Sequence, residues 1–227
     1  MSYSNLDSKL INEYFNYYRK YYGAEYRYGQ GLDEITDIIS HYSKQGTWID
    51  LGGGTSTIIW LPAFNNIKKV YTVDNFEEAF YVQEVVRKET PSGCYQHILE
   101  RYGKSYEILR RIPIEFMQVD LLRTINIQLT CDNVTQFGLL GLCSDKTQYF
   151  RQLDQFTSLM KLGAVFIGAN WVFSEKYRIE RHLDNTYIKA GLIKEWAESR
   201  GRILLKETMI PIQNDRNYDS VLVYVFM

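Results

Sequence analysis

The sequence predicts an α/β fold with a mostly parallel seven-stranded sheet, and three patterns carry this prediction. Short apolar runs alternate with segments of helical periodicity along most of the chain. Such alternation is typical of parallel strands joined by crossover helices. The last two apolar runs are separated only by a turn, which indicates an antiparallel C-terminal hairpin. A glycine-rich turn follows the first apolar run, as in strand–turn–helix units that bind ligands.

The elements are predicted in order from these patterns. Mostly apolar runs predict strands at residues 48–51, 70–73, 114–120, 134–142, 164–169, 203–212 and 220–226. Apolar stripes at spacings of three and four predict helices at residues 5–22, 32–42, from 55, 76–89, 95–111, after 145, and 186–199. Residues 170–171 are expected to open a loop, and residues 171–184 to form part of a pocket wall.

Composition limits the class of protein. At 227 residues and 45% hydrophobic content, the chain fits one domain, with residues 1–45 as a helical lid on a core of residues 46–227. A net charge of -1, from 26 basic and 27 acidic residues without a basic run, argues against nucleic-acid binding. The three cysteines form no close pair and the start of the chain is polar, so we expect a cytoplasmic protein. We expect a monomer without a membrane partner.

The glycine-rich turn lies in the sequence TWIDLGGGTSTIIWL, which covers residues 47–61. Gly52, Gly53 and Gly54 allow a sharp turn and close approach of a ligand, and Ser56 lies where a helix can begin. The next apolar run ends in Asp74, followed by Asn75, at about the distance at which a carboxylate binds ribose hydroxyls. Together these features predict an adenosine-containing ligand. The alternative is an ordinary tight turn with Asp74 as a helix cap.

The type of adenosine ligand follows from two positions near the turn. A dinucleotide fingerprint requires a third glycine where this chain has Thr57. Asp50 lies two residues before the first glycine, and the resulting D-x-G-x-G pattern resembles the first motif of methyltransferases that use S-adenosylmethionine (SAM). An acid at this position can bind the ammonium group of the methionine end, directly or through water.

Two further acids lie near ends of predicted strands. Asp120 closes the third strand, at the edge where open α/β sheets bind ligands. It can hold the adenine amine, or it can be a turn residue. Asp145 follows the fourth strand, and it is either an acid that faces the substrate or a cap of the next helix.

Taken together, these motifs resemble the family of nicotinamide, phenylethanolamine and thioether methyltransferases. The motifs are the tyrosine-rich segment 17–22, the turn at 50–54, Asp74, Asp120, LCSD at 142–145 and VFIGA at 165–169. The resemblance implies a Rossmann-like SAM-dependent methyltransferase fold with SAM as cofactor. It implies that Tyr17 and Tyr22 contact the methionine end, and that Asp120 and Leu121 bracket adenine.

For the reaction, the resemblance implies methyl transfer to a nitrogen of a small amine, guanidine or pyridine-like metabolite. It places Asp145 and Tyr177 at the substrate, and Asp145 is our first choice for the acid that orients or accepts the amine proton. Other residues predicted at the substrate are Tyr21, Asn170, Trp171, Glu175 and Asp219, and Asp215 is a further candidate acid. The nicotinamide enzyme has an acid after its fifth strand where this chain has Asn170, which argues against nicotinamide itself.

Several other functions remain open at this point. A protein of similar build can cyclise SAM to azetidine-2-carboxylate and release methylthioadenosine, and a regulatory protein can bind SAM without turnover. A nicotinamide-dinucleotide oxidoreductase is disfavoured by Thr57. The three histidines, His41, His97 and His182, are far apart, so no metal site is predicted.

Overall fold

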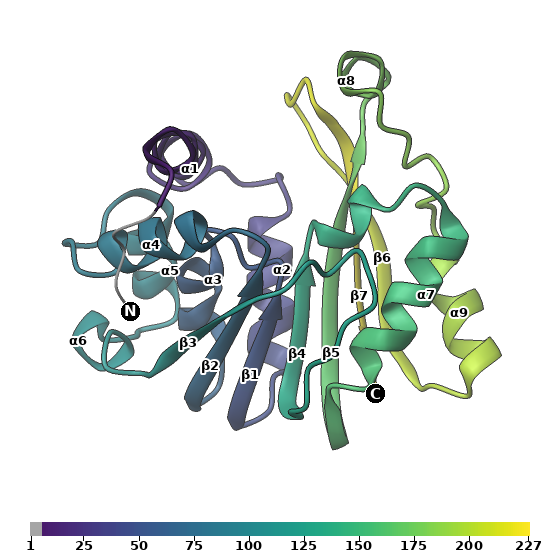
Figure 1. Cartoon of the computed structure of the whole chain (residues 1–227), viewed down its shortest axis with the longest axis horizontal. Helices are drawn as coiled ribbons and strands as arrows, with labels where there is room; N and C mark the ends of the chain where they lie inside the picture. The colour runs from purple at the N-terminus through teal and green to yellow at the C-terminus, as the bar shows by residue number, and fades with distance from the viewer. Residues whose placement is uncertain (1–5) are drawn as a thin grey trace.

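The computed structural model describes residues 6–227 and contains one seven-stranded sheet with the strand order β3-β2-β1-β4-β5-β7-β6 (Figure 1). The strands are β1 Gly46–Leu51, β2 Ile67–Asp74, β3 Ile114–Gln118, β4 Cys131–Phe137, β5 Met160–Phe173, β6 Leu204–Pro211 and β7 Tyr218–Phe226. Strands β1 to β5 pair in parallel, whereas β7 is antiparallel to both β5 and β6. The predicted α/β class and the C-terminal hairpin are confirmed.

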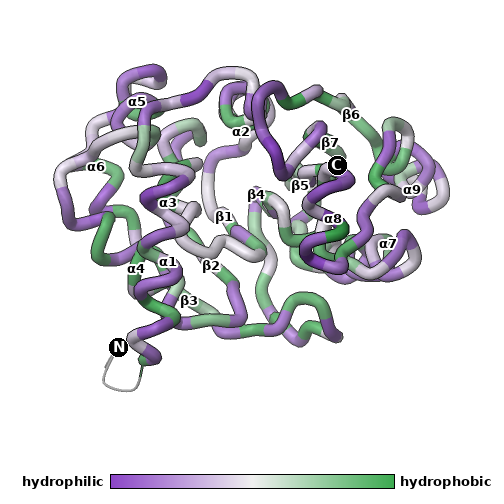
Figure 2. Tube along the Cα trace, turned by 90° about the horizontal axis from the view of Figure 1, so that it is seen from above, coloured by the Kyte–Doolittle hydropathy of each residue, from purple (hydrophilic) through white to green (hydrophobic). Residues whose placement is uncertain are grey.

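Helices cover both faces of this sheet. They are α1 Ser8–Tyr21, α2 Leu32–Tyr42, α3 Thr57–Trp60, α4 Glu77–Val86, α5 Gly93–Arg101, α6 Tyr106–Leu109, α7 Lys146–Thr157, α8 Glu175–Arg181 and α9 Leu192–Arg200, with 3-10 turns η1 Leu61–Ala63 and η2 Leu139–Leu142. Figure 2, viewed from above, places α3, α4 and α5 on one side of the strands and α7 and α9 on the other. Helix α1 lies above the sheet beside α4, with which it is in contact (Figure 1).

Alternation along β7 shows why the sheet is buried on both faces. Val221, Val223 and Val225 pack in the core that includes α2, α3 and α5. Leu222 and Tyr224, between them in the sequence, pack in the core that includes α7 and α9. Successive side chains of a strand point to opposite faces, so an unbroken apolar run is what a strand covered on both sides requires.

The structure corrects several predicted boundaries. The predicted strand 134–142 ends at Phe137, because Gly138 turns the chain with a φ of 97° and η2 follows. The predicted strand 164–169 belongs to the longer β5, so Asn170 and Trp171 lie in a strand and not in a loop. Pairing with β7 continues through both residues.

Two predicted helices also differ. The predicted helix 95–111 is divided into α5 and α6, with Gly103 between them at a φ of 59°. The predicted helix 186–199 starts only at Leu192, after Gly191 at a φ of 88°. Helix α1 starts at Ser8 with Asp7 as its cap, and residue 5 of the predicted helix 5–22 lies outside the described residues. Within residues 6–227, no helix is long and apolar enough to cross a membrane.

Candidate functional site

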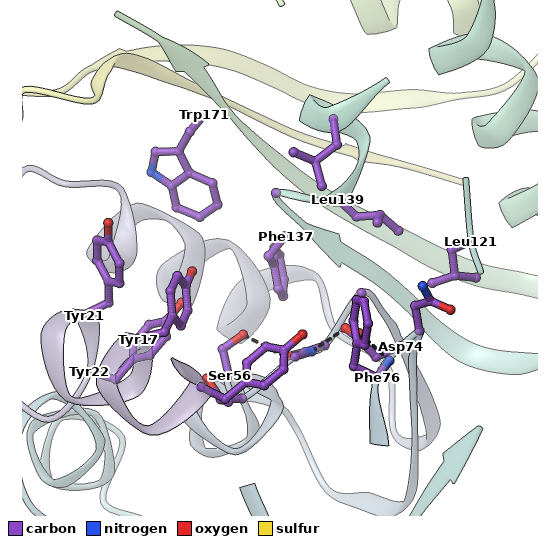
Figure 3. Close-up of a pocket in the computed structure, with 18 of the residues that line it drawn as sticks. Tyr17, Tyr21, Tyr22, Ser56, Asp74, Phe76, Leu121, Phe137, Leu139 and Trp171 are labelled. Carbon is purple, nitrogen blue, oxygen red and sulfur yellow. Dashed lines mark hydrogen bonds between the residues drawn. The ribbon is translucent and has the colours of Figure 1, made fainter. Parts of the chain in front are cut away.

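A cavity of about 480 Å³ lies at the carboxyl edge of the sheet. Its wall is formed by α1, by the turn after β1, by the residues after β2 and β3, by η2 and by the ends of β5 and β7. Figure 3 shows tyrosines of α1 on one side of this space and Trp171 and Leu139 on the other. This is the edge at which open α/β sheets bind ligands.

The glycine turn forms the floor of the cavity. The N–H groups of Gly52 and Gly53 donate to the carbonyl of Val73, at 2.8 and 3.3 Å, which fixes the turn against β2. A Cβ atom added to Gly53 would collide with the hydroxyls of Thr57 and Thr72. Only glycine therefore fits at this position without displacing its neighbours.

Asp50 lies beneath this turn and does not line the cavity. Its carboxylate is 1% exposed and accepts hydrogen bonds from the hydroxyls of Thr57, at 2.8 Å, and Thr135, at 2.7 Å. Burial raises the pKa of Asp50 to about 6. Thr57, the residue that breaks the dinucleotide fingerprint, is therefore part of the buried support of the turn.

Asp74 connects the end of β2 to the glycine turn. Its carboxylate accepts hydrogen bonds from the N–H of Gly54, at 3.0 Å, and from the N–H of Phe76, at 3.2 Å. Burial raises the pKa of Asp74. Thr55, also in the cavity wall, is 1% exposed, and its hydroxyl has no partner in the described part of the chain. A buried hydroxyl without a partner is costly, so it is available to a ligand.

Helix α1 contributes Tyr14, Tyr17, Tyr21 and, directly after its end, Tyr22. The rings of Tyr17 and Tyr21 lie 4.7 Å apart, and Tyr22 is buried against Trp60. Burial raises the pKa of Tyr22 well above its ordinary value, so its hydroxyl stays protonated and can donate.

Both ends of α1 are attached to the core. The carbonyl of Tyr22 accepts from the N–H of Cys94 at 3.0 Å, and the N–H of Asp7 donates to Glu78 at 3.0 Å. These attachments hold the tyrosines of α1 over the glycine turn.

The wall opposite α1 is aromatic as well. The ring of Tyr218 lies 6.3 Å from Trp171 and 6.0 Å from Phe173. Burial raises the pKa of Tyr218, and the nearby phenols of Tyr17 and Tyr21 raise it further. Tyr218 lines the same cavity as Tyr17 and Tyr21, so β7 and α1 face each other across it.

The charges of the cavity are all negative. Asp74, Asp120 and Asp215 line it, and no lysine, arginine or histidine does so among the described residues. Asp120 is paired with Arg123 at 2.9 Å. Asp215 accepts from the N–H of Asn217 at 2.7 Å through Oδ1, and its Oδ2 has no hydrogen bond within residues 6–227. The arrangement suits a ligand that is cationic or neutral where it faces these acids.

The structure brings many of the predicted site residues together. Those that line the cavity are Tyr17, Tyr21, Tyr22, Gly52, Gly53, Gly54, Ser56, Asp74, Asn75, Asp120, Leu121 and Trp171. They come from α1, from the turns and loops after β1, β2 and β3, and from β5.

Other predicted residues do not line the cavity. Asp145 is exposed and caps α7, accepting from the N–H of Gln148 at 2.8 Å. That bond, together with one from the Ser144 hydroxyl, lowers the pKa of Asp145. Tyr177 lies behind Tyr218, at 5.8 Å between ring centres. Glu175 and Asp219 are exposed, on α8 and β7.

Asn170 is fully buried in a polar network beneath the cavity. Its side-chain oxygen accepts from Tyr149 at 2.7 Å and from Gln136 at 2.8 Å. Gln136 accepts in turn from the N–H of Leu140, at 3.1 Å, and donates to Tyr224. This network positions η2, and Asn170 supports the cavity wall without reaching its surface.

Sequence reasoning missed several residues of the wall, among them Tyr14, Gln30, Phe76, Val119, Leu122, Phe137, Leu139, Leu142, Ile212 and Tyr218. Phe173 falls within residues 171–184, which were expected to form part of a pocket wall. Phe76 has a local signal, because it follows Asp74 and Asn75 directly. Phe137, Leu139 and Leu142 lack one, since the end of β4 and η2 were predicted as one continuous strand. The described residues contain no group of three metal-binding side chains.

The sequence matches no protein-family model and no curated protein. Many solved structures share the fold. One is a magnesium protoporphyrin IX methyltransferase from Synechocystis with bound SAM, at 16% identity and a TM-score of 0.57, covering 99% of each chain. Another is a SAM-dependent methyltransferase from Clostridium acetobutylicum, at 12% identity and a TM-score of 0.56, covering 96% of this chain and 98% of that one.

A third similar structure is the N-methyltransferase NodS from Bradyrhizobium japonicum, in complex with S-adenosylhomocysteine. It has 13% identity and a TM-score of 0.54, and the match covers 86% of this chain and 82% of that one. At these identities the likeness concerns the fold. The chain has the Rossmann-like fold of SAM-dependent methyltransferases.

Proposed function

We propose that this protein is a SAM-dependent methyltransferase that acts on a nitrogen of a small amine, guanidine or pyridine-like metabolite. The observation that carries the proposal is the cavity at the carboxyl edge, which joins aromatic faces and three carboxylates to a glycine turn and has no basic side chain in its described wall. The neighbours that hold SAM or S-adenosylhomocysteine support it. The proposal includes SAM as cofactor, a small-molecule acceptor, a monomer, and no nucleic-acid or membrane partner.

The residues of the cavity fit SAM in both charge and hydrogen bonding. Asp74 would hold the ribose, and Asp120 and Leu121 would hold the adenine. The unpartnered hydroxyl of Thr55 and the protonated Tyr22 can donate to the methionine carboxylate. A dinucleotide fits poorly, because its pyrophosphate would meet carboxylates and no cation.

The chain would contribute binding, orientation and exclusion of water. Bound SAM supplies a methyl group already activated on a sulfonium. The tyrosines of α1 and the ring of Tyr218 enclose the space above the glycine turn, and aromatic faces stabilise cations. Holding two reactants in line in such an enclosed space is the main catalytic contribution that this reaction requires.

The acid that faces the acceptor is a choice between two residues. The resemblance favoured Asp145, which is exposed, caps α7 and has a lowered pKa. Asp215 lines the cavity beside Tyr218 and has a free carboxylate oxygen within the described chain. We therefore propose Asp215 as the group that orients the amine and accepts its proton.

The test is incubation of the purified protein with SAM, alone and with a panel of amines, guanidines and pyridines, followed by mass spectrometry. The proposal predicts S-adenosylhomocysteine together with a methylated product for one acceptor class. Methylthioadenosine formed without an acceptor would instead identify cyclisation of SAM. Tight binding of SAM with no product from any acceptor would indicate a regulatory protein.

A further inference from the structure

A second cavity, of about 300 Å³, adjoins the acceptor side of the first. It lies between the end of α1, the segment that leads to α2, and the turn between β6 and β7. The two cavities share four wall residues, Tyr21, Gln30, Leu32 and Asp215. The two cavities are therefore adjacent, with Asp215 in the wall of both.

The charges change sign between the two cavities. The second is lined by three cations, Lys20, Arg27 and Arg216, together with the acids Glu25 and Asp215. None of the three cations forms an ion pair with another described residue. They come from three separate segments, and the first cavity has no basic residue among those described. The second cavity is thus the side that attracts an anion.

The residues that line both cavities lie where the sign of the charge changes. Asp215 is fixed there by the bond from the N–H of Asn217, at 2.7 Å. Lys20 lies on the other side of the shared Tyr21, with its Nζ 4.8 Å from the ring centre. An ammonium or amine next to Asp215 and an anionic group next to Arg27 or Arg216 would each meet the opposite charge.

We propose that the acceptor carries a carboxylate, which binds in the second cavity while its amine lies beside Asp215 in the first. The substrate class is then an amino acid or a similar amino-carboxylate. Three cations against two acids give this wall an excess of positive charge, which attracts a carboxylate. The inference rests on the proposed function, since it describes the acceptor of that reaction.

The experiment compares matched pairs of probes by isothermal titration calorimetry on the protein saturated with S-adenosylhomocysteine. Each pair differs by one carboxylate: phenylalanine and phenethylamine, histidine and histamine, tyrosine and tyramine. For at least one pair we expect the amino acid to bind about tenfold more tightly than the amine, as for a hydrogen-bonded charge pair. Equal binding within every pair, or no binding of any amino acid, overturns the inference.

Variants then assign the preference to the second cavity. The double variant Arg27→Gln and Arg216→Gln is expected to reduce the preference to about twofold or less, with unchanged affinity for S-adenosylhomocysteine. Arg19→Gln is the control, because Arg19 is a neighbouring exposed residue of α1 that stacks on Phe15 and lines neither cavity. A preference that survives in the double variant contradicts the inference.

The same titrations separate this inference from the proposed function. If S-adenosylhomocysteine fails to bind, the proposed function is contradicted. The paired probes are then titrated into the protein alone, where binding of the amino acids still tests the charge of the second cavity. Binding of the amino acids that is lost in the double variant and kept in the control variant would support the assignment. Amino acids that do not bind to the protein alone would contradict it.

Discussion

The carboxylate of Asp74 accepts a hydrogen bond of 3.0 Å from the backbone N–H of Gly54. This bond connects the end of β2 to the turn after β1, and it holds the carboxylate in the wall of the cavity. Two residues 20 positions apart in the sequence thereby form one surface. The turn can keep its position only while β1 and β2 stay in register.

Asp74→Asn is expected to weaken binding of S-adenosylhomocysteine about 10- to 100-fold, as for the loss of hydrogen bonds to a charged group. The amide oxygen can still accept from Gly54, so the fold should persist. Calorimetry measures the affinity and thermal unfolding checks the fold. Asp132→Asn is the control, because Asp132 binds Thr47 and Lys161 at the opposite edge of the sheet. Equal affinities for both variants would exclude Asp74 from ligand binding.

Gly53→Ala is expected to destabilise the protein by about 1–3 kcal/mol, as overpacking of a filled core does. The new methyl group would collide with Thr57 and Thr72, whose hydroxyls are 3.0 Å apart and part of the support of Asp50. Gly141→Ala is the matched control, since the nearest atoms to its Cβ are at 3.6 Å, an ordinary contact. Denaturant unfolding measures both. A Gly53 variant as stable as the Gly141 variant would show that the turn can shift.

The pH dependence of stability should report on Asp50. Its pKa is about 6 in the folded protein, against an ordinary value of 3.8. The folded state therefore binds the Asp50 proton more tightly than the unfolded state does. The stabilisation of the folded state by this proton is complete below pH 3.8 and is lost as the pH rises through 6. The resulting change in the free energy of unfolding between low and high pH is on the order of 3 kcal/mol.

The variant Asp50→Asn removes this titration. It should unfold with nearly the same free energy as the wild type at low pH and become the more stable of the two above pH 6. Denaturant unfolding at several pH values from 3.5 to 8 measures the difference. Curves that stay parallel over the whole range would show that the pKa of Asp50 is not raised in the folded protein.

The sequence predicted the fold well because the strands carry strong local signals. A short, uninterrupted run rich in β-branched and aromatic residues, such as Val221–Phe226, indicates a strand that is buried on both faces, as β7 is. The glycine turn and Asp74 were predicted for a similar reason, since both are fixed by their distance from a strand end. The predicted strand boundaries were wrong where the apolar run continued beyond the end of the strand, as it does after Phe137.

The acceptor side of the cavity could not be predicted in the same way. Asp215 and Tyr218 approach α1 because β7 inserts between β5 and β6, and the pairing of β7 with β5 is long-range and has no local signal. Asn170 and Trp171 are neighbours in one strand, and therefore point to opposite faces. That alternation places Trp171 in the cavity and Asn170 in the core, whereas a loop would have allowed both to reach the ligand.

Substitution of each candidate acid decides which one orients the acceptor amine and accepts its proton. Asp215→Asn is expected to lower kcat/KM for the amine by about 10²-fold, in the range typical of general-base removal. Asp145→Asn should stay within about twofold, because asparagine caps a helix as well as aspartate does. Steady-state kinetics at saturating SAM measures both. The reverse result would restore the assignment of Asp145 that the resemblance implies.

Asn170→Ala tests whether the residue supports the fold or binds substrate. The change removes the hydrogen bonds that Asn170 accepts from the Tyr149 hydroxyl and the Gln136 amide in a fully buried site, at a cost of about 0.5–1.5 kcal/mol for each lost bond. The unfolding temperature should therefore fall clearly. The KM for the acceptor, measured well below the unfolding temperature, should change little. Tyr224→Phe is the matched control, since it removes one hydroxyl of the same network and keeps the ring. A large rise in KM with unchanged stability would instead place Asn170 in contact with the substrate.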